Sequence, residues 1–326
     1  MRTNVIFDTD AGGDIDDLYA LVLILKHPNL NLLGVTTVSA DTQARARVIA
    51  KMLRLAERPD VPVYAGIRIP KAFVQRGMDE TTYKQYLTHL ELVTTDDPEH
   101  GQAYGDAVAF ILEALRQTET PITLIGTGPW TNIAEVLRLA DEQQKSMIDA
   151  VALMGGEVHL LHNESNVLHD PEAADLILHS GVPIFLATWS VCRHLTFTMA
   201  EVAALTHDSP SPFLQALREA TDLWWNAGVD YKPGPMCYDV IPVFWAAGER
   251  EPISCIKLDE LTVELAGTHT RGMMVVHPWE RMNAEKTDTT SADYLTITDS
   301  LNTEVLKERY IDLVFNTNYV LEEHQC

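Results

Sequence analysis

Five carboxylates fall within ten residues near the start of the chain, a spacing that predicts chemistry at this point. They follow a short apolar run, residues 5–7, and come just before a helical run, residues 18–25. The five are Asp8, Asp10, Asp14, Asp16 and Asp17. A helix N-terminus offsets the repulsion by only about 0.3–1 kcal/mol per charge. The cluster therefore predicts a bound cation, and its hard oxygen ligands suit Ca²⁺ or Mg²⁺.

Other interpretations of this acidic stretch account for less of it. A helix cap explains Asp16 and Asp17 alone. An EF-hand loop needs Asp or Asn fifth and Glu twelfth, but counting from Asp8 these positions hold Gly12 and Tyr19. A haloacid-type Mg²⁺ phosphotransferase also places D-x-D after a first strand, yet Gly12 stands where that class usually has Thr or Val. That class leaves Asp16 and Asp17 unused, and it stays as an alternative.

The elements that must position these acids alternate between strand and helix. Apolar, strand-type runs predict strands at 3–8, 31–37, 61–64, 122–125, 151–154 and 182–187. Helical spacing predicts helices at 16–27, 41–57, 105–115 and 170–178. Another helix is expected after residues 126–132, and it runs through Leu139. This alternation predicts a Rossmann-like α/β fold, with an open, mainly parallel (mixed) sheet flanked by helices. Ligands of such sheets bind beyond the carboxyl ends of the strands, where the acids lie.

The remaining segments are assigned to the same single domain, residues 1–326. Residues 198–245 are expected to be helical with a break at 228–235. Strands are expected at 253–256, 261–265, 273–276 and 294–297, followed by a final helix at 302–315. Residues 66–104 are long and weakly periodic, which fits equally a lid over the site and a surface excursion.

Composition limits the partners and the compartment. A hydrophobic content of 46% over 326 residues is enough for a large core. The formal charge of −23 argues against a nucleic-acid polymer as partner. The four cysteines show no paired spacing, which predicts a reduced, cytoplasmic protein. A strand begins at once, so no signal peptide is expected, and no apolar run reaches the about 18 residues that a membrane span needs.

Three later segments place polar groups at a predicted strand end or helix start. They are Gly126-Thr-Gly128, Asn163-Glu-Ser-Asn166 and Tyr238-Asp239. Taken singly, each fits an ordinary tight turn, a solvated loop or an N-cap aspartate. Like the first acidic stretch, they lie where ligands of an open α/β sheet bind.

The first acidic stretch resembles the opening signature of the nucleoside hydrolases, the inosine-uridine-preferring family, usually written D-x-D-x-G-x-D-D-A. Here it stands as Asp8-Thr-Asp-Ala-Gly-Gly-Asp-Ile-Asp-Asp17, with a longer gap before the paired acids. Further blocks match in order over nearly the whole chain: Gly34–Ser39, Gly126–Asn132, Met154–Gly156, Glu164–Asn166 with Asp170–Ala174, and Asp239. Several ordered blocks are hard to obtain by chance.

The resemblance implies a Ca²⁺-dependent hydrolase that splits purine or pyrimidine ribonucleosides into base and ribose, and it suggests a homodimer or homotetramer. The implied Ca²⁺ ligands are Asp10, Asp17, the Thr127 carbonyl and Asp239. The implied ribose contacts are Asp16, Glu164, Asn166 and Asp239, with Met154 packed near the sugar. Asp10 would act as general base toward a water on the Ca²⁺. Nearby carboxylates would stabilise an oxocarbenium-like transition state.

Two residues depart from the family pattern and leave parts of the site open. Asp41 stands where the family often has Asn, and it either contacts a ribose hydroxyl or only caps its helix. Tyr238 stands where the family often has the His that protonates the leaving base. A phenol with a pKa of about 10 can donate a hydrogen bond at neutral pH. We therefore expect Tyr238 to contact the base without being a strong acid.

Aromatic and histidine side chains are the other candidates for the base. Trp224 and Trp225 are adjacent on a predicted helix, so their side chains point about 100° apart, and at most one faces the site; Trp225 is the candidate. Tyr231 could also stack. Of the loop histidines His159, His162 and His169, His162 is the candidate leaving-group acid. A catalytically silent Ca²⁺ and pentose-binding protein remains a second alternative to the hydrolase, besides the phosphotransferase.

Overall fold

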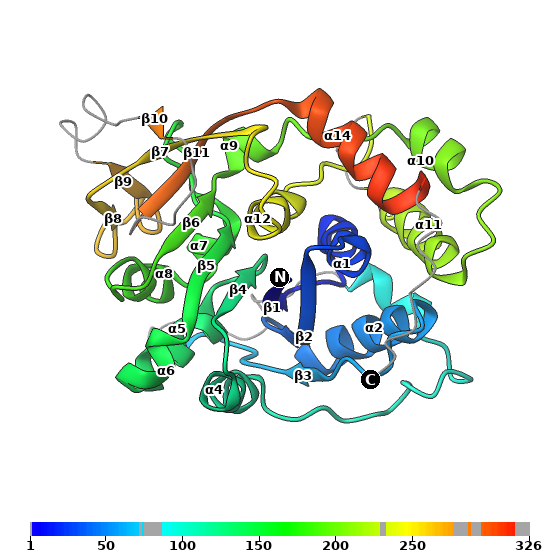
Figure 1. Cartoon of the computed structure of the whole chain (residues 1–326), viewed down its shortest axis with the longest axis horizontal. Helices are drawn as coiled ribbons and strands as arrows, with labels where there is room; N and C mark the ends of the chain where they lie inside the picture. Colours follow the sequence, from blue (N-terminus) through cyan, green and yellow to red (C-terminus); the bar gives the residue numbers. More distant parts are fainter. Residues whose placement is uncertain are drawn as a thin grey trace.

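The computed structural model describes residues 2–71, 74, 87–228, 233–276, 286–287 and 295–316. Within these, nine strands form one sheet in the order β10-β7-β11-β6-β5-β4-β1-β2-β3 (Figure 1). The strands are β1 Thr3–Thr9, β2 Leu30–Thr37, β3 Val63–Ala65, β4 Ile122–Gly126, β5 Ile148–Met154, β6 Ile184–Ala187, β7 Ile253–Lys257, β10 Lys286–Thr287 and β11 Leu295–Leu301. Pairs from β3 through to β11 are parallel, whereas β7 runs antiparallel to both β11 and β10. The predicted open, mainly parallel α/β sheet is confirmed.

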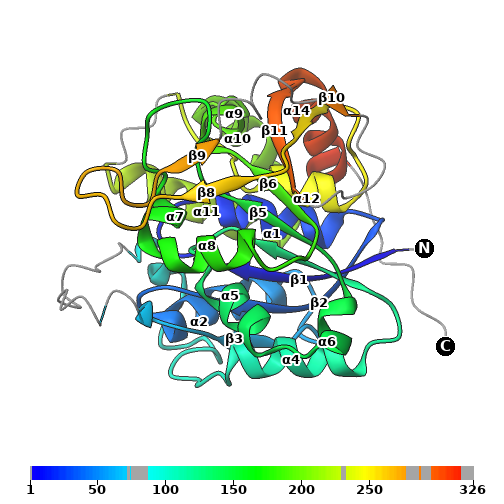
Figure 2. The same cartoon turned by 90° about the vertical axis from the view of Figure 1, so that its left-hand side faces the viewer.

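Helices cover both faces of this sheet. Those whose side chains join the first core are α1 Asp16–Lys26, α2 Thr42–Leu55, α11 Pro212–Asn226, α12 Val240–Ala246 and α14 Thr303–Ile311. Those of the second core are α4 Ala107–Gln117, α5 Thr131–Leu139 and α8 Pro171–Leu178. Figure 2 shows α8 and α5 in front of the strands, with α1 behind them. The remaining described elements are the helices α6 Glu142–Ser146, α7 Ser165–His169, α9 Trp189–Cys192 and α10 Met199–Thr206, the hairpin β8 Leu261–Val263 with β9 Met274–Val276, the 3-10 turn η2 Thr88–Leu92, and the π turn η3 Asp312–Asn316.

The two cores follow from the alternation of side chains along each strand. In β1, Val5 and Phe7 join the core beside α1, and Ile6 joins the core beside α5. All three are buried. Full burial of an aliphatic or aromatic side chain of this size is worth about 1.5–3 kcal/mol. The central strands therefore hold their carboxyl ends in a fixed row, and the loops that follow them start from rigid points.

The first strand leads into the first helix through a tight turn that Gly12 makes possible. Its φ of +130° is rarely adopted by other residues. A Cβ at this position would lie 3.2 Å from the Leu87 side chain and 3.5 Å from the Arg45 guanidinium. The turn is therefore closely packed on the side away from the sheet.

Several details differ from the sequence-based expectations. The short helix α6 and the two-residue strand β10 were not expected, and the loop that carries His159 and His162 leads into the helix α7, which ends at His169. The helical region 198–245 is three helices, α10, α11 and α12. Within 66–104, residues 72–73 and 75–86 lie outside the described residues, while η2 packs against α2 and α11. Among the described helices, none combines the length and apolar character that a membrane crossing requires.

Candidate functional site

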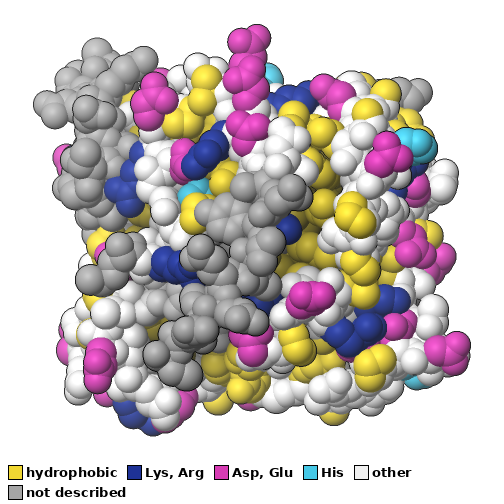
Figure 3. Space-filling model, turned by 45° about the vertical axis from the view of Figure 1, so that its right-hand side comes forward, with side chains coloured by type: hydrophobic (Ala, Val, Ile, Leu, Met, Phe, Trp, Pro, Cys, Tyr) yellow, Lys and Arg dark blue, Asp and Glu magenta, His cyan; other side chains and the backbone are white. Residues whose placement is uncertain are grey.

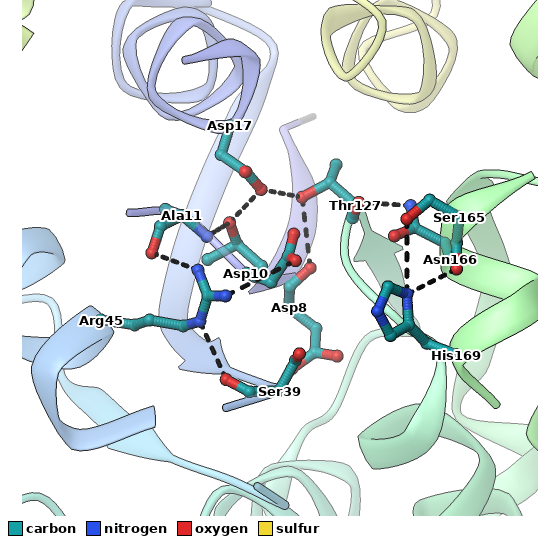
Figure 4. A network of polar contacts seen from close by, with 11 residues as sticks. Asp8, Asp10, Ala11, Asp17, Ser39, Arg45, Thr127, Ser165, Asn166 and His169 are labelled. Carbon is teal, nitrogen blue, oxygen red and sulfur yellow. Dashed lines mark hydrogen bonds and ion pairs between the residues drawn. The ribbon is translucent and has the colours of Figure 1, made fainter. Parts of the chain in front are cut away.

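Three neighbouring strands end at the same edge of the sheet and carry the polar residues singled out above. Asp8 lies in β1 and Asp10 just after it, Thr127 follows β4, and Met154 ends β5. These strands pair in parallel in the order β5-β4-β1, so their ends meet. Figure 4 shows Asp10, Asp17, Thr127 and Asn166 converging there from different elements. The predicted gathering of the first acidic stretch with two of the later segments is thus observed.

The closest group of acids comes from the starts of two helices that pack against each other. Asp16 and Asp17 open α1, and Asp239 stands at the N-cap position of α12. One oxygen from each of the three lies within 4.8 Å of the others, and all three residues are buried. Asp239 makes no capping hydrogen bond, so the N-cap interpretation does not explain it.

The electrostatics of this group suit a cation. Burial first, and then the charge of Asp10, raise the pKa of Asp17 to about 7, against the hydrogen bonds from Thr9 and Thr127. The pKa values of Asp16 and Asp239 are also raised, by burial and by repulsion among these acids. Buried carboxylates that repel one another are stabilised by a cation with oxygen preference, such as Ca²⁺ or Mg²⁺. The donor set therefore fits the predicted metal.

Thr127 holds α1 to the end of β4. Its hydroxyl donates to an Asp17 oxygen at 2.8 Å, and its amide donates to the Asp8 carbonyl at 2.9 Å. The hydroxyl of Thr9 also donates to the same Asp17 oxygen. The Thr127 carbonyl, expected as a metal ligand, accepts a 2.7 Å hydrogen bond from the Asn166 side chain. Asp17 is thus fixed by two hydroxyls before any cation binds.

Asp10 lies beside this group rather than within it. Its side chain is 17% exposed, and one of its oxygens is 3.8 Å from the buried guanidinium of Arg45. It does not belong to the group of three carboxylates described above. Its partial exposure suits a base that meets water, and its two expected roles, as ligand and as base, stay predictions.

Asp8 has a structural part in the site. Its carboxylate accepts hydrogen bonds from the Thr36 hydroxyl at 2.6 Å and from the Asn132 amide at 2.7 Å. Burial raises its pKa to about 7 against the effect of these bonds. It therefore joins β1, β2 and α5 beneath the site, and the five acids of the sequence divide into different tasks.

Glu164 and Asn166 are held by the turn that follows β5. The Glu164 carboxylate caps α7 and also accepts from the Gly156 amide at 2.7 Å. Asn166 donates to the carbonyls of Thr127 and Met154, at 2.7 and 3.2 Å. All of these side chains are buried, and burial raises the pKa of Glu164. This arrangement fixes the Glu164 carboxylate and the Asn166 amide beside Thr127, which in turn binds Asp17. A site that binds two neighbouring hydroxyls requires fixed groups of this kind.

The candidate residues for the nucleobase are less tightly grouped. Tyr238 is buried and its hydroxyl donates to the Met236 sulfur at 2.9 Å. Of the adjacent pair, Trp224 is buried; burial raises the pKa of Asp14 to about 6, and an interaction with Trp224 lowers it in part. Trp225 is half-buried, with its ring 6.2 Å from that of Trp224. Of the two, Trp224 is the one that reaches the acidic stretch; contact of Trp225 with a base stays a prediction.

His162 and Asp41 lie at the margin of the described site. His162 is exposed and its ring packs against Trp189 in a tilted arrangement, with ring centroids 4.6 Å apart. The Asp41 carboxylate accepts from the Ala44 amide at 3.1 Å and caps α2, which confirms one of its two expected roles. Tyr231 lies outside the described residues.

Sequence reasoning missed Arg45, which is fully buried beside the acidic stretch. It donates to the carbonyls of Ser39 at 2.9 Å and Ala11 at 3.0 Å. One signal was present in the sequence. Arg45 precedes Val48, Ile49 and Met52 at helical spacing, so it lies on the buried face of an amphipathic helix. A cation at such a position needs acceptors inside the protein.

Comparison with known proteins finds relatives over most of the chain. Residues 5–307 match the family described as inosine-uridine preferring nucleoside hydrolase. A pyrimidine-specific ribonucleoside hydrolase, RihA, of Salmonella paratyphi B is 28% identical over 85% of this chain and 89% of its own length. Its counterpart in Shewanella baltica is 33% identical over 69% of this chain and 70% of its own length.

Solved structures agree on the fold. A plant nucleoside hydrolase superposes with a TM-score of 0.79 at 20% identity, covering 97% of this chain and 100% of its own. A purine-preferring ribonucleoside hydrolase from Gardnerella vaginalis reaches 0.77 at 21% identity, covering 96% and 98%. Because the family match spans most of the chain, including every polar segment of the site, this chain belongs to the inosine-uridine preferring nucleoside hydrolase family.

Proposed function

We propose that this chain uses Ca²⁺ to hydrolyse the N-glycosidic bond of purine or pyrimidine ribonucleosides, releasing free base and ribose. The observation that carries the proposal is the convergence of Asp16, Asp17 and Asp239 within 4.8 Å, at the sheet edge that also holds Glu164 and Asn166. Family membership supports the N-glycosyl hydrolase activity. Uridine and cytidine are the first substrates to try, because RihA relatives are named pyrimidine-specific.

The proposed roles follow from the contacts at the site. Asp10, Asp17, Asp239 and the Thr127 carbonyl would hold the cation. Bound there, Ca²⁺ supplies a fixed positive charge that orients the ribose diol and the attacking water. Asp16, Glu164, Asn166 and Asp239 would bind the ribose hydroxyls, and Met154 would pack near the sugar.

The proposed reaction needs one general base, Asp10, and one leaving group, the nucleobase. Water attacks the anomeric carbon, and Asp10 accepts a proton from that water. The bond from the sugar to the base breaks, and its electron pair leaves with the base, which then takes up a proton. Positive charge that develops on the sugar is stabilised by the buried carboxylates around it.

The assembly state and the compartment stay predictions. A homodimer or homotetramer is expected from the resemblance alone. A cytoplasmic location is supported by three cysteines of the described chain, Cys192, Cys237 and Cys255, which are free and buried. Reduced cysteines of this kind are typical of a reducing compartment.

The first prediction tests the reaction and its metal together. Chelator-treated protein is incubated with ribonucleosides and 2′-deoxynucleosides, with and without Ca²⁺ or Mg²⁺, and released reducing sugar is measured. We expect Ca²⁺-dependent release from ribonucleosides, and a far lower kcat/KM for the 2′-deoxy substrates, because a site that binds a hydroxyl can discriminate by up to about 10⁴–10⁵-fold. Asp10→Asn should lower kcat by at least about 10²-fold, the usual scale of general-base catalysis.

Asp208→Asn is the matched control for this substitution, since the Asp208 side chain is 97% exposed. Full activity of Asp10→Asn, or full activity after exhaustive chelation, would contradict the proposal. Binding of ribose without turnover of any nucleoside would instead favour the silent pentose-binding alternative.

A further inference from the structure

We propose that Arg45 is a positioning residue that fixes the loop between β1 and α1, residues 10–15, before the cation binds. The inference rests on the proposed function, because this loop carries Asp10 and leads into Asp16 and Asp17. Arg45 lies in the first turn of α2 and is 0% exposed. Its Nε donates to the Ser39 carbonyl at 2.9 Å and its Nη1 donates to the Ala11 carbonyl at 3.0 Å. One planar group thus joins two loops at the sheet edge (Figure 4).

The loop that contains Ser39 has a backbone conformation that needs support. Ser39 and Ala40 have φ values of 72° and 54°, the left-handed region that residues other than glycine rarely occupy. Their amides donate to the carbonyls of Ile67 and Arg68, at 2.9 and 2.8 Å. The Ser39 carbonyl is bound on the other side by Arg45. The turn is therefore held from two sides, which is how strained backbone persists at functional sites.

The loop between β1 and α1 is also held from two sides, by Arg45 of α2 and by His89 of η2. The Ala11 carbonyl accepts from Arg45, and the next carbonyl, that of Gly12, accepts from the His89 amide in η2 at 3.0 Å. Ala11 and His89 are both 0% exposed. Burial and the charge of Arg45 lower the pKa of His89 to about 4, so this histidine is neutral at physiological pH. Arg45 therefore supplies the positive charge at this contact.

Arg45 could affect Ca²⁺ binding in two ways, and these predict opposite changes in Ca²⁺ affinity when Arg45 is removed. As a charge alone, 3.8 Å from Asp10, it would repel Ca²⁺, and its removal would tighten Ca²⁺ binding. As a planar fork that binds two carbonyls, it would keep the ligand loop in place, and its removal would weaken Ca²⁺ binding. Lysine keeps the charge but not the fork. The hydrogen bonds favour the second way.

The test compares Arg45→Lys and Arg45→Met in the full-length protein. Arg47→Met is the control, because Arg47 is on the same helix and donates to the Gln102 carbonyl at 3.3 Å instead. The readouts are hydrogen exchange of residues 10–15 in chelator-treated protein, and the Ca²⁺ dissociation constant by calorimetry. We expect both Arg45 variants to speed exchange in this segment and to weaken Ca²⁺ binding by about 10–100-fold, as residues that orient metal ligands commonly do. Arg47→Met should match the wild type.

Wild-type exchange and Ca²⁺ affinity in Arg45→Lys would overturn the proposal, and so would tighter Ca²⁺ binding in Arg45→Met. If Arg45→Met fails to fold, as judged by thermal melting, Arg45→Lys decides, since it retains the length and the charge. The exchange experiment needs neither substrate nor metal. A wild type that turns over no nucleoside would therefore end the proposed function and leave the role of Arg45 to be decided separately.

Discussion

Under the proposed function, Tyr238 is the residue expected to contact the departing base. Its hydroxyl donates to the Met236 sulfur at 2.9 Å, and a thioether is a weak acceptor. A phenol with a pKa of about 10 donates a hydrogen bond at neutral pH but gives up its proton less readily than an imidazolium. Tyr238 therefore suits contact with the base better than full protonation of it.

The second prediction compares Tyr238→Phe with His162→Ala on two substrates. On a natural nucleoside we expect Tyr238→Phe to lower kcat by less than about 10²-fold, the lower end of the range for a general acid. On an activated nitrophenyl riboside, which needs little protonation, both variants should match the wild type. A larger loss in Tyr238→Phe, confined to the nucleoside, would make it the acid. The same pattern in His162→Ala would require that exposed ring to leave Trp189 and enter the site.

At the scale of elements, the turn from β2 into α2 brings a strained backbone, a helix cap and a buried cation together. Asp41 is the N-cap of α2 and accepts from the Ala44 amide at 3.1 Å. Ser39 and Ala40 just before it have positive φ. Loss of the cap would therefore loosen the same turn that Arg45 binds.

The third prediction separates the two expected roles of Asp41. Asp41→Ala should lower the free energy of unfolding by about 1 kcal/mol, the usual value of an N-cap, whereas Asp41→Asn should retain it. Denaturant melts measure this difference. If capping is its whole role, kcat/KM of Asp41→Asn stays close to wild type. A selective rise in KM for ribonucleosides in Asp41→Asn would show that the carboxylate also contacts the sugar.

The sequence predicted the elements with strong periodicity and missed those without it. The central strands and the helices beside them carry continuous apolar runs or helical spacing, and they were placed within a few residues. The helix α6 is polar and five residues long, and only its capping box between Asp141 and Gln144 could have indicated it. The strand β10 has two residues, too few for any pattern.

The sequence predicted which residues belong to the site better than it predicted what each of them does. Spacing alone placed Asp16 and Asp17 at a helix start, and the resemblance added Asp239, which the fold brings beside them. Nothing in the sequence distinguished Asp8, because its task depends on Thr36 and Asn132, which are distant in the chain. Contacts of this kind are set by packing between elements.

At the scale of the whole molecule, the acids behind the net charge of −23 fall into two groups, those on the surface and those inside the protein. Figure 3 shows acidic side chains scattered over the face it presents, with basic side chains between them. Such dispersed charges interact weakly through water and salt. Inside the protein, by contrast, buried acids lie close together at one edge of the sheet. The dependence of stability on pH and on metal should therefore come mainly from this internal group.

The fourth prediction is that metal-free protein loses stability as the pH rises from about 5 to about 7. Burial raises the pKa of Asp8 and of Asp17 to about 7, and also raises the pKa of Asp16 and Asp239. In the unfolded chain these acids have a pKa of about 3.9. An acid whose pKa is raised by folding stabilises the fold fully below the unfolded value, and that contribution is lost as the pH rises from the unfolded to the folded value. Burial lowers the pKa of His89 to about 4, which makes stability rise with pH up to the ordinary histidine value of about 6.5 and offsets the effect of one acid over part of this window.

Thermal melting with and without Ca²⁺ checks this prediction. One pKa unit corresponds to about 1.4 kcal/mol, and about 1 kcal/mol moves the melting temperature of a large domain by about 2–4 °C. We expect the melting temperature of chelated protein to fall by at least about 5 °C across the window, on this scale. With Ca²⁺ the slope should flatten or reverse, because ionised ligands bind the cation more tightly. Asp17→Asn removes one titrating group and should reduce the slope without Ca²⁺. A melting temperature of chelated protein that stays level or rises with pH would mean that these acids are not held together as the fold requires.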